Sequence, residues 1–160
     1  MVKSDGVSYL RLDKTVADEN SILLFSLGRS IRYREGADVT LFAAGGILRD
    51  AIQAAKLLQE FGIDAGVVSM FSIKPIDKDT IIDAVNETGS IMTIEEHNIN
   101  GGLGNAVAEV CMDNGFIPKK FLRIGLDNQY SSIVGSQDYL KAHYQIDTTA
   151  IVKRVKILLE

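Results

Sequence analysis

Two carboxylates and a histidine stand together near the middle of the chain, in the stretch SIMTIEEHNINGGLGNAVAEV, residues 90–110. Alternate residues of a strand face opposite sides, so Glu95 and His97 would share one face while Glu96 points away. A carboxylate beside an imidazole can orient the ring or raise its pKa, which suits general-base chemistry. In the structural alternative, His97 satisfies backbone groups at the corner and the glutamates pair across an interface.

Three glycines, Gly101, Gly102 and Gly104, follow this triplet. They lie between an expected strand and an expected helix, where free N–H groups and the helix dipole can hold an anion. A dinucleotide fingerprint would need a glycine in place of Val107, and a phosphate-binding lysine followed by Ser or Thr is absent. We favour the alternative that the glycines let the helix approach the sheet closely and turn the chain sharply.

Other reactive residue types give little support for a site. Beyond His97 the chain has only His143 as an imidazole, with no carboxylate at a ligand-type spacing from it, so no metal site is predicted. Cys111 belongs to a helical apolar pattern and is expected to be a buried, unreactive thiol. In SIKPID, Pro75 is expected to end a strand, and Lys74 could hold an anion at the same sheet edge.

Composition predicts a single globular domain. The chain has 160 residues, of which 46% are apolar and 24% are charged. The formal net charge of −4 favours neither a nucleic-acid partner nor an anionic membrane. No apolar run approaches the roughly 18 residues of a membrane span, and no signal peptide is recognised. We therefore expect a cytoplasmic protein.

The elements that must position these residues alternate from Asp38 onward. Buried strands are expected in DVTLFAAG, DAGVVSMFSI, SIMTIEE and KKFLRIGL. Between them, ILRDAIQAAKLLQEF, DKDTIIDAVNET and GLGNAVAEVCMDN have helical apolar faces, and two closing helices follow. Helix N-caps are expected at Asp77 and Ser136, and the last helix is expected to begin at Asp147. This alternation predicts a three-layer α/β/α sandwich.

The first 37 residues do not follow this alternation. VSYLRL, residues 7–12, is typical of one short strand. The segment that follows it is typical of a connecting arm, with a further strand in IRYRE. An orphan strand and a long arm suggest the carboxy-terminal portion of a longer assembly. The alternative is that Tyr9 to Leu12 form simply an edge strand.

Three ordered motifs, REGADVTLFAAGGILRDAIQAAKLLQEFGIDAGVVSMFSIKPID, TIEEHNINGGLGNAVAEV and RIGLDNQY, resemble the carboxy-terminal domain of the transketolase family. They are most similar to the C-terminal subunit of two-subunit bacterial transketolases. The resemblance implies a five-stranded, mostly parallel sheet whose early strand, residues 31–35, is antiparallel. It also implies that 38–160 are the C-terminal domain and 1–37 an arm that includes the terminal strand of a missing upstream pyrimidine-binding domain.

For function, the resemblance implies an enzyme that uses thiamine diphosphate and Mg²⁺ to move a two-carbon ketol unit between sugar phosphates. In that family the cofactor lies between a diphosphate-binding and a pyrimidine-binding domain. This chain would need those domains or a subunit carrying them as partners, and would serve assembly of a homo-oligomer. Alone, it is expected to bind no cofactor or metal and to be inactive.

No catalytic residue is therefore expected here, and His97 is the one candidate. Six residues remain candidates for a domain interface or an anion site: Glu95, Glu96, His97, Gly101, Gly102 and Gly104. The alternatives are the same domain of a deoxyxylulose-phosphate synthase or of a 2-oxo-acid dehydrogenase β subunit, or an independent α/β ligand-binding module.

Overall fold

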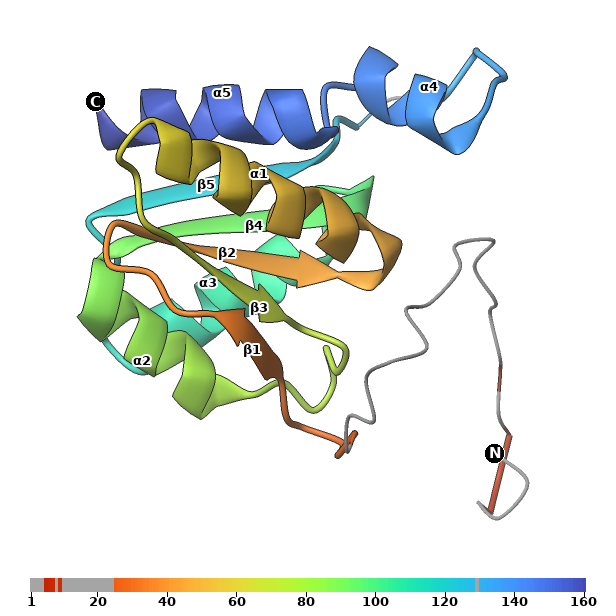
Figure 1. Ribbon diagram of the computed structural model, residues 1–160. Coiled ribbons are helices and arrows are strands. Elements are labelled where there is room, and N and C mark those ends of the chain that lie inside the picture. Colours follow the sequence, from red (N-terminus) through yellow and green to blue (C-terminus); the bar gives the residue numbers. More distant parts are fainter. Residues whose placement is uncertain (1–4, 8, 10–24, 129) are drawn as a thin grey trace.

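The computed structural model describes residues 5–7, 9, 25–128 and 130–160 (Figure 1). The strand expected over residues 7–12 falls mostly outside this set. The strand expected in IRYRE is present as β1 (Ile31–Arg34) and belongs to the main sheet. The sheet therefore begins within the range 1–37.

The sheet has five strands in the order β1-β3-β2-β4-β5. The remaining strands are β2 (Val39–Ala44), β3 (Ala65–Ser69), β4 (Ser90–Asn98) and β5 (Lys120–Leu126). β1 pairs with β3 in the antiparallel direction, and all the other pairs are parallel. The mostly parallel sheet with one antiparallel strand is thus confirmed.

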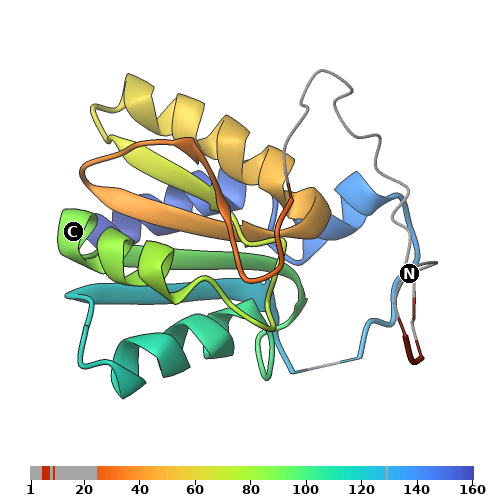
Figure 2. The ribbon, with the colours of Figure 1, turned by 90° about the horizontal axis from the view of Figure 1, so that it is seen from below.

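Helices cover both faces of this sheet, which confirms the three-layer sandwich (Figure 2). On one face lie α1 (Leu48–Glu60), which follows a short 3-10 turn at Gly45–Ile47, and α5 (Thr148–Leu159). On the other lie α2 (Lys78–Thr88) and α3 (Leu103–Asp113). The short α4 (Gln137–His143) lies beyond the start of α5 and buries none of its residues.

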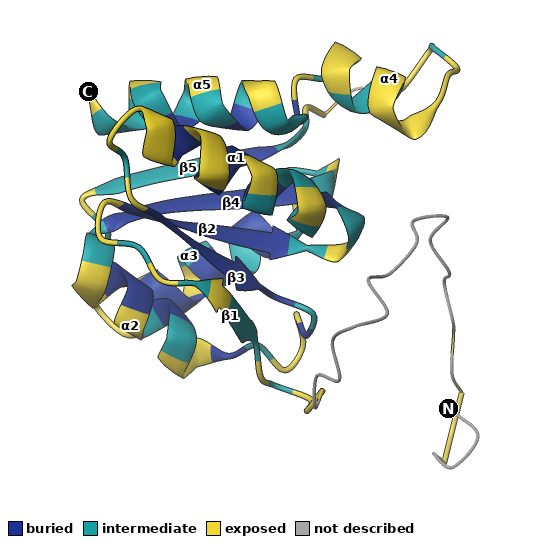
Figure 3. Ribbon diagram, viewed as in Figure 1, coloured by how far each residue is buried: buried dark blue, intermediate teal, exposed yellow. Residues whose placement is uncertain are grey.

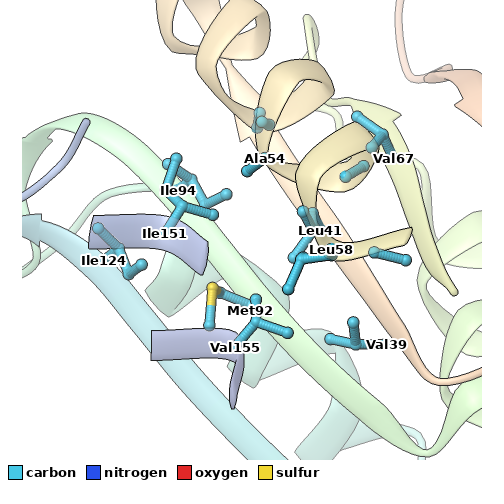
Figure 4. Packing of buried hydrophobic residues seen from close by; sticks show 14 of the residues in the cluster. Val39, Leu41, Ala54, Leu58, Val67, Met92, Ile94, Ile124, Ile151 and Val155 are labelled. Carbon is cyan, nitrogen blue, oxygen red and sulfur yellow. The ribbon is translucent and has the colours of Figure 1, made fainter. Parts of the chain in front are cut away.

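Two apolar clusters hold the layers together because side chains alternate along each strand. Leu41 of β2 belongs to the cluster beneath α1 and α5, whereas the adjacent Phe42 belongs to the one beneath α2 and α3. Figure 4 shows the first cluster, in which Leu58 and Ile151 bring the two helices onto the sheet. The central strands are buried while the outer faces of the helices are exposed (Figure 3). Cys111 lies in the second cluster, as expected, and burial raises the pKa of its thiol.

The two expected N-caps, Asp77 and Ser136, are present, and Asp147 caps the last helix as well. The side chains of Asp77, Ser136 and Asp147 accept hydrogen bonds from backbone N–H groups three residues later. One strand boundary was wrong: β3 ends at Ser69, well before Pro75. The chain leaves the sheet because the Ser72 hydroxyl donates to the Pro75 carbonyl oxygen at 2.6 Å and closes a turn there.

Candidate functional site

The corner between β4 and α3 contains the carboxylate pair and the glycines. β4 extends through Asn98, so Glu95, Glu96 and His97 all lie within the strand. Glu95 is 3% exposed and faces α3. Glu96 is half-buried, and its Oε1 accepts a hydrogen bond of 2.9 Å from Nε2 of Gln137, at the start of α4. The two carboxylates therefore serve opposite faces of the sheet.

The Glu95 carboxylate caps α3. Its Oε2 accepts a hydrogen bond of 2.8 Å from the backbone N of Leu103, and its Oε1 accepts one of 3.0 Å from Gly104. Gly102, the residue in the N-cap position, has no side chain to do so. A negative charge at a helix N-terminus is also stabilised by the helix dipole. The position that could have held an external anion is thus filled by the chain's own carboxylate.

The glycines make room for this carboxylate and for the sheet. A Cβ on Gly102 would lie 1.8 Å from Glu95 Oε2, and a Cβ on Gly104 would lie 2.6 Å from Cδ of Arg123. Gly101 has open space around it, but its φ of +78° favours glycine. These contacts are those expected of a helix that approaches the sheet closely.

His97 lies at the outer end of this corner, and its side chain is 60% exposed. Its Nδ1 lies 2.7 Å from the carbonyl oxygen of Asn98 and 3.9 Å from Oε2 of Glu95. The longer distance exceeds a hydrogen bond. The Glu95 oxygens accept from the helix, and the His97 ring donates its Nδ1–H to the Asn98 carbonyl oxygen. The carboxylate therefore does not orient the ring as it would in an acid–base pair.

Arg123 of β5 is a residue of this corner that the sequence interpretation missed. Its Nη1 donates to the Ile99 carbonyl oxygen at 3.1 Å and to Oδ1 of Asn105 at 2.8 Å. The guanidinium therefore ties the loop after β4 to the first turn of α3. The signal in the sequence was a charged residue in the interior of the strand, flanked on both sides by apolar residues, with nothing to indicate its partners.

A second corner, between β3 and α2, lies at the same edge of the sheet. Asp77 caps α2 and also accepts hydrogen bonds from the backbone N of Ser30 at 2.8 Å and from its hydroxyl at 2.9 Å. Burial opposes ionisation of Asp77, but these hydrogen bonds and those from Thr80 outweigh it and lower its pKa. Lys74 is exposed and forms no ion pair within the described residues. The hydrogen bonds of Ser72 and Asp77 to segment 25–30 mean that this corner fastens that segment to the domain.

The groups at these corners do not suit a diphosphate or its metal ion. The two N–H groups at the start of α3 that would receive a phosphate already donate to Glu95. Within 5–7, 9, 25–128 and 130–160, no three His, Cys, Asp or Glu side chains gather as metal ligands would.

In that same part of the chain, no helix combines the length and apolar character needed to cross a membrane.

Comparison with known proteins identifies the family. A family model described as transketolase, C-terminal domain, matches residues 28–151, and the chain therefore belongs to this family. It is 39% identical over 154 residues to a putative transketolase C-terminal section of Methanocaldococcus jannaschii, covering 94% of this chain and 47% of the relative. It is also 39% identical over 135 residues to one subunit of an apulose-4-phosphate transketolase of Phocaeicola vulgatus, covering 84% and 42%.

A solved structure leads to the same family. The chain matches a structure described as a split gene transketolase, inactive beta4 tetramer, with a TM-score of 0.78 and 35% identity. The match covers 86% of this chain and 44% of that one. The chain thus spans less than half the length of these relatives.

Proposed function

We propose that this chain is the C-terminal domain of a thiamine-diphosphate-dependent transketolase and serves its assembly. The observation that carries this proposal is the family match over residues 28–151, together with relatives named as a transketolase C-terminal section and a transketolase subunit. The complete enzyme would move a two-carbon ketol unit between sugar phosphates in the cytoplasm. Thiamine diphosphate and Mg²⁺ would bind to its other domains. The connecting arm would lie within 1–37, ahead of β1, because β1 already belongs to the sheet of the C-terminal domain.

The state of the β4–α3 corner supports a role without catalysis on this chain. Glu95 is buried and bound to the N-terminus of α3, so its carboxylate serves the fold. His97 is exposed at the rim and bound to backbone. We assign His97, and Glu96 with its partner Gln137, to the surface that contacts the neighbouring domains.

Apolar side chains around the same rim support a contact surface there. The carboxyl edge consists of the segments that follow β2, β3, β4 and β5: residues 45–47, 70–77, 99–102, 127–128 and 130–136. Ile73, Tyr130 and Val134 of this edge are exposed, as is Leu27 of the segment held by Asp77 and Ser72. Exposed apolar side chains gathered on one edge are typical of an interaction surface. The pyrimidine-binding domain is the proposed partner at this edge.

Reconstitution tests the proposal. The chain would be purified alone and also co-expressed with the adjoining coding sequences, and each sample assayed for ketol transfer from a ketose phosphate to an aldose phosphate. Turnover is expected only from the co-expressed complex. Ketol transfer by the chain alone, or a complex that forms without any turnover, would contradict the proposal.

The role of His97 can be separated in the same assay. If His97 lies at the domain contact, His97→Ala weakens association of the chain with its partner and leaves kcat at saturating partner concentration unchanged. If the imidazole acts on substrate, kcat falls while association is unchanged. Asp113→Ala, at the far end of α3, is a matched surface control that should alter neither quantity.

A further inference from the structure

The dipeptide Asn-Gly occurs twice in this chain, as Asn100–Gly101 and as Asn114–Gly115. The first pair lies in the loop between β4 and α3, and the second follows the last residue of α3. An asparagine before a glycine readily loses its side-chain amide, because glycine has no Cβ to hinder attack by its backbone nitrogen. The two pairs share this sequence but differ in their surroundings.

Hydrogen bonds at the end of α3 restrain Asn114. Its Nδ2 donates to the carbonyl oxygen of Val110 at 2.8 Å, so the side chain is held against the end of the helix. The backbone N of Gly115, which would have to attack this side chain, donates to the Met112 carbonyl oxygen at 3.3 Å. Attack at Asn114 therefore requires both hydrogen bonds to break first.

Asn100 has neither restraint within the described residues. Its side-chain amide forms no hydrogen bond there, and neither does the backbone N of Gly101. Residues 99–102 belong to no helix or strand, and Asn100 and Gly101 are both exposed. Asn114 is exposed as well, so exposure does not separate the two sites. They differ in the hydrogen bonding of the amide that would leave and of the nitrogen that would attack.

We propose that Asn100 is a site of spontaneous deamidation in the folded chain, whereas the hydrogen bonds at the end of α3 protect Asn114. The backbone N of Gly101, after loss of its proton to base, attacks Cγ of Asn100. A new C–N bond forms, and the side-chain nitrogen takes up a proton and leaves as ammonia. Water then opens the cyclic imide at either carbonyl, which gives aspartate at position 100 or its β-linked isomer.

Either product changes the carboxyl edge. Each adds one negative charge to a chain whose formal net charge is −4. The β-linked isomer also lengthens the backbone by one carbon between positions 100 and 101, just before Gly102, which packs against the Glu95 carboxylate. The reaction needs only this loop and water. It can therefore be tested on the full chain without a partner, and its outcome does not depend on the proposed function.

Peptide mapping by mass spectrometry tests the proposal. The folded chain is incubated at physiological temperature in mildly alkaline buffer, and conversion of each asparagine to aspartate or its isomer is followed over time. Asn100 is expected to convert at least tenfold faster than Asn114, and faster still at higher pH, because base removes the Gly101 proton. Equal conversion of the two, faster conversion of Asn114, or no conversion of Asn100 overturns the proposal.

Incubation in denaturing guanidinium chloride shows whether the fold causes the difference. The hydrogen bonds at the end of α3 are absent from the unfolded chain, so Asn114 should then convert at a rate within threefold of that of Asn100. If the tenfold preference for Asn100 persists in denaturant, flanking sequence selects the site, and the protective role of the α3 hydrogen bonds is contradicted.

Two matched variants give a second readout on the intact protein. Asn100→Gln and Asn114→Gln each keep an amide but add a methylene group, which disfavours ring closure. On ion-exchange chromatography, wild type and Asn114→Gln should accumulate a more acidic species at the same rate. Asn100→Gln should accumulate it at least tenfold more slowly. An Asn100→Gln variant that acidifies as fast as wild type would contradict the assignment to Asn100.

Discussion

Two corners at the same edge of the sheet hold their helices by different means. At the β3–α2 corner, Asp77 immediately precedes the helix and caps it through the backbone N of Thr80. At the β4–α3 corner, the capping carboxylate belongs to Glu95, inside the preceding strand, and the residue at the N-cap position is Gly102. The first cap depends on local sequence, and the second depends on how closely the helix approaches the strand.

This difference determines what each corner can bind. The Asp77 carboxylate has an oxygen to spare for Ser30, so it also fastens the incoming segment. The Glu95 carboxylate uses both oxygens on α3 and occupies the place where a phosphate would sit. A strand–glycine–helix corner is therefore not evidence of an anion site until the partners of the helix N–H groups are known.

The largest effect is expected from Gly102→Ala. The new Cβ would lie 1.8 Å from Glu95 Oε2, although the backbone φ of −96° suits any residue. Displacing the carboxylate combines overpacking with loss of a cap, and should lower the free energy of unfolding by about 3 kcal/mol. Urea denaturation of the variant and of the wild type measures this difference in the free energy of unfolding.

Gly101→Ala is the matched control for this substitution. Gly101 has open space around it and a φ of +78°, so only the left-handed conformation is penalised, by about 1 kcal/mol. If Gly101→Ala and Gly102→Ala lose the same free energy of unfolding, the Glu95 carboxylate does not occupy the space beside Gly102.

Glu95→Gln should cost about 2 kcal/mol, because the amide retains one acceptor oxygen for two buried N–H donors and loses the charge. Glu96→Gln, one residue along the strand, makes the same change at a half-buried position and should alter stability by less than about 0.5 kcal/mol. Chemical denaturation of both variants checks the difference. If Glu95→Gln is as stable as Glu96→Gln, the Glu95 carboxylate does not contribute to the stability of the corner.

Asp77→Ala should cost about 1.5 kcal/mol and also release segment 25–30. Asp147→Ala removes a cap of the same kind from α5 and is the control, at about 1 kcal/mol. Hydrogen exchange at the Ser30 amide should accelerate in the Asp77 variant alone. Unchanged exchange at Ser30 would mean that the segment is held by other contacts.

The smallest effect concerns pH. The pKa of Asp77 is lowered in the folded state from its ordinary value of 3.8, so its carboxylate stabilises the fold above that value. This contribution is lost as the pH falls through the lowered folded pKa. The stability difference between wild type and Asp77→Asn should therefore shrink between about pH 5 and pH 2. A difference that is constant or grows on acidification would show that the folded pKa is not lowered.

The sequence predicted the layers, the mixed sheet and the cap at Asp77, because these depend on periodicity, local spacing or family resemblance. It did not predict that Glu95 caps α3, because that contact joins residues eight and nine positions apart across a reversal. The end of β3 at Ser69 was also missed, since the turn depends on Ser72 and on its contact with Gly28.

Calorimetric titration of the isolated chain with thiamine diphosphate and Mg²⁺ tests whether this chain binds the cofactor by itself. If Glu95 fills the β4–α3 corner and the chain contributes only assembly to a thiamine enzyme, the isolated chain has no site for the cofactor. No saturable heat is expected from the chain alone, for wild type and Glu95→Gln alike. Saturable micromolar binding by the wild-type chain would contradict it.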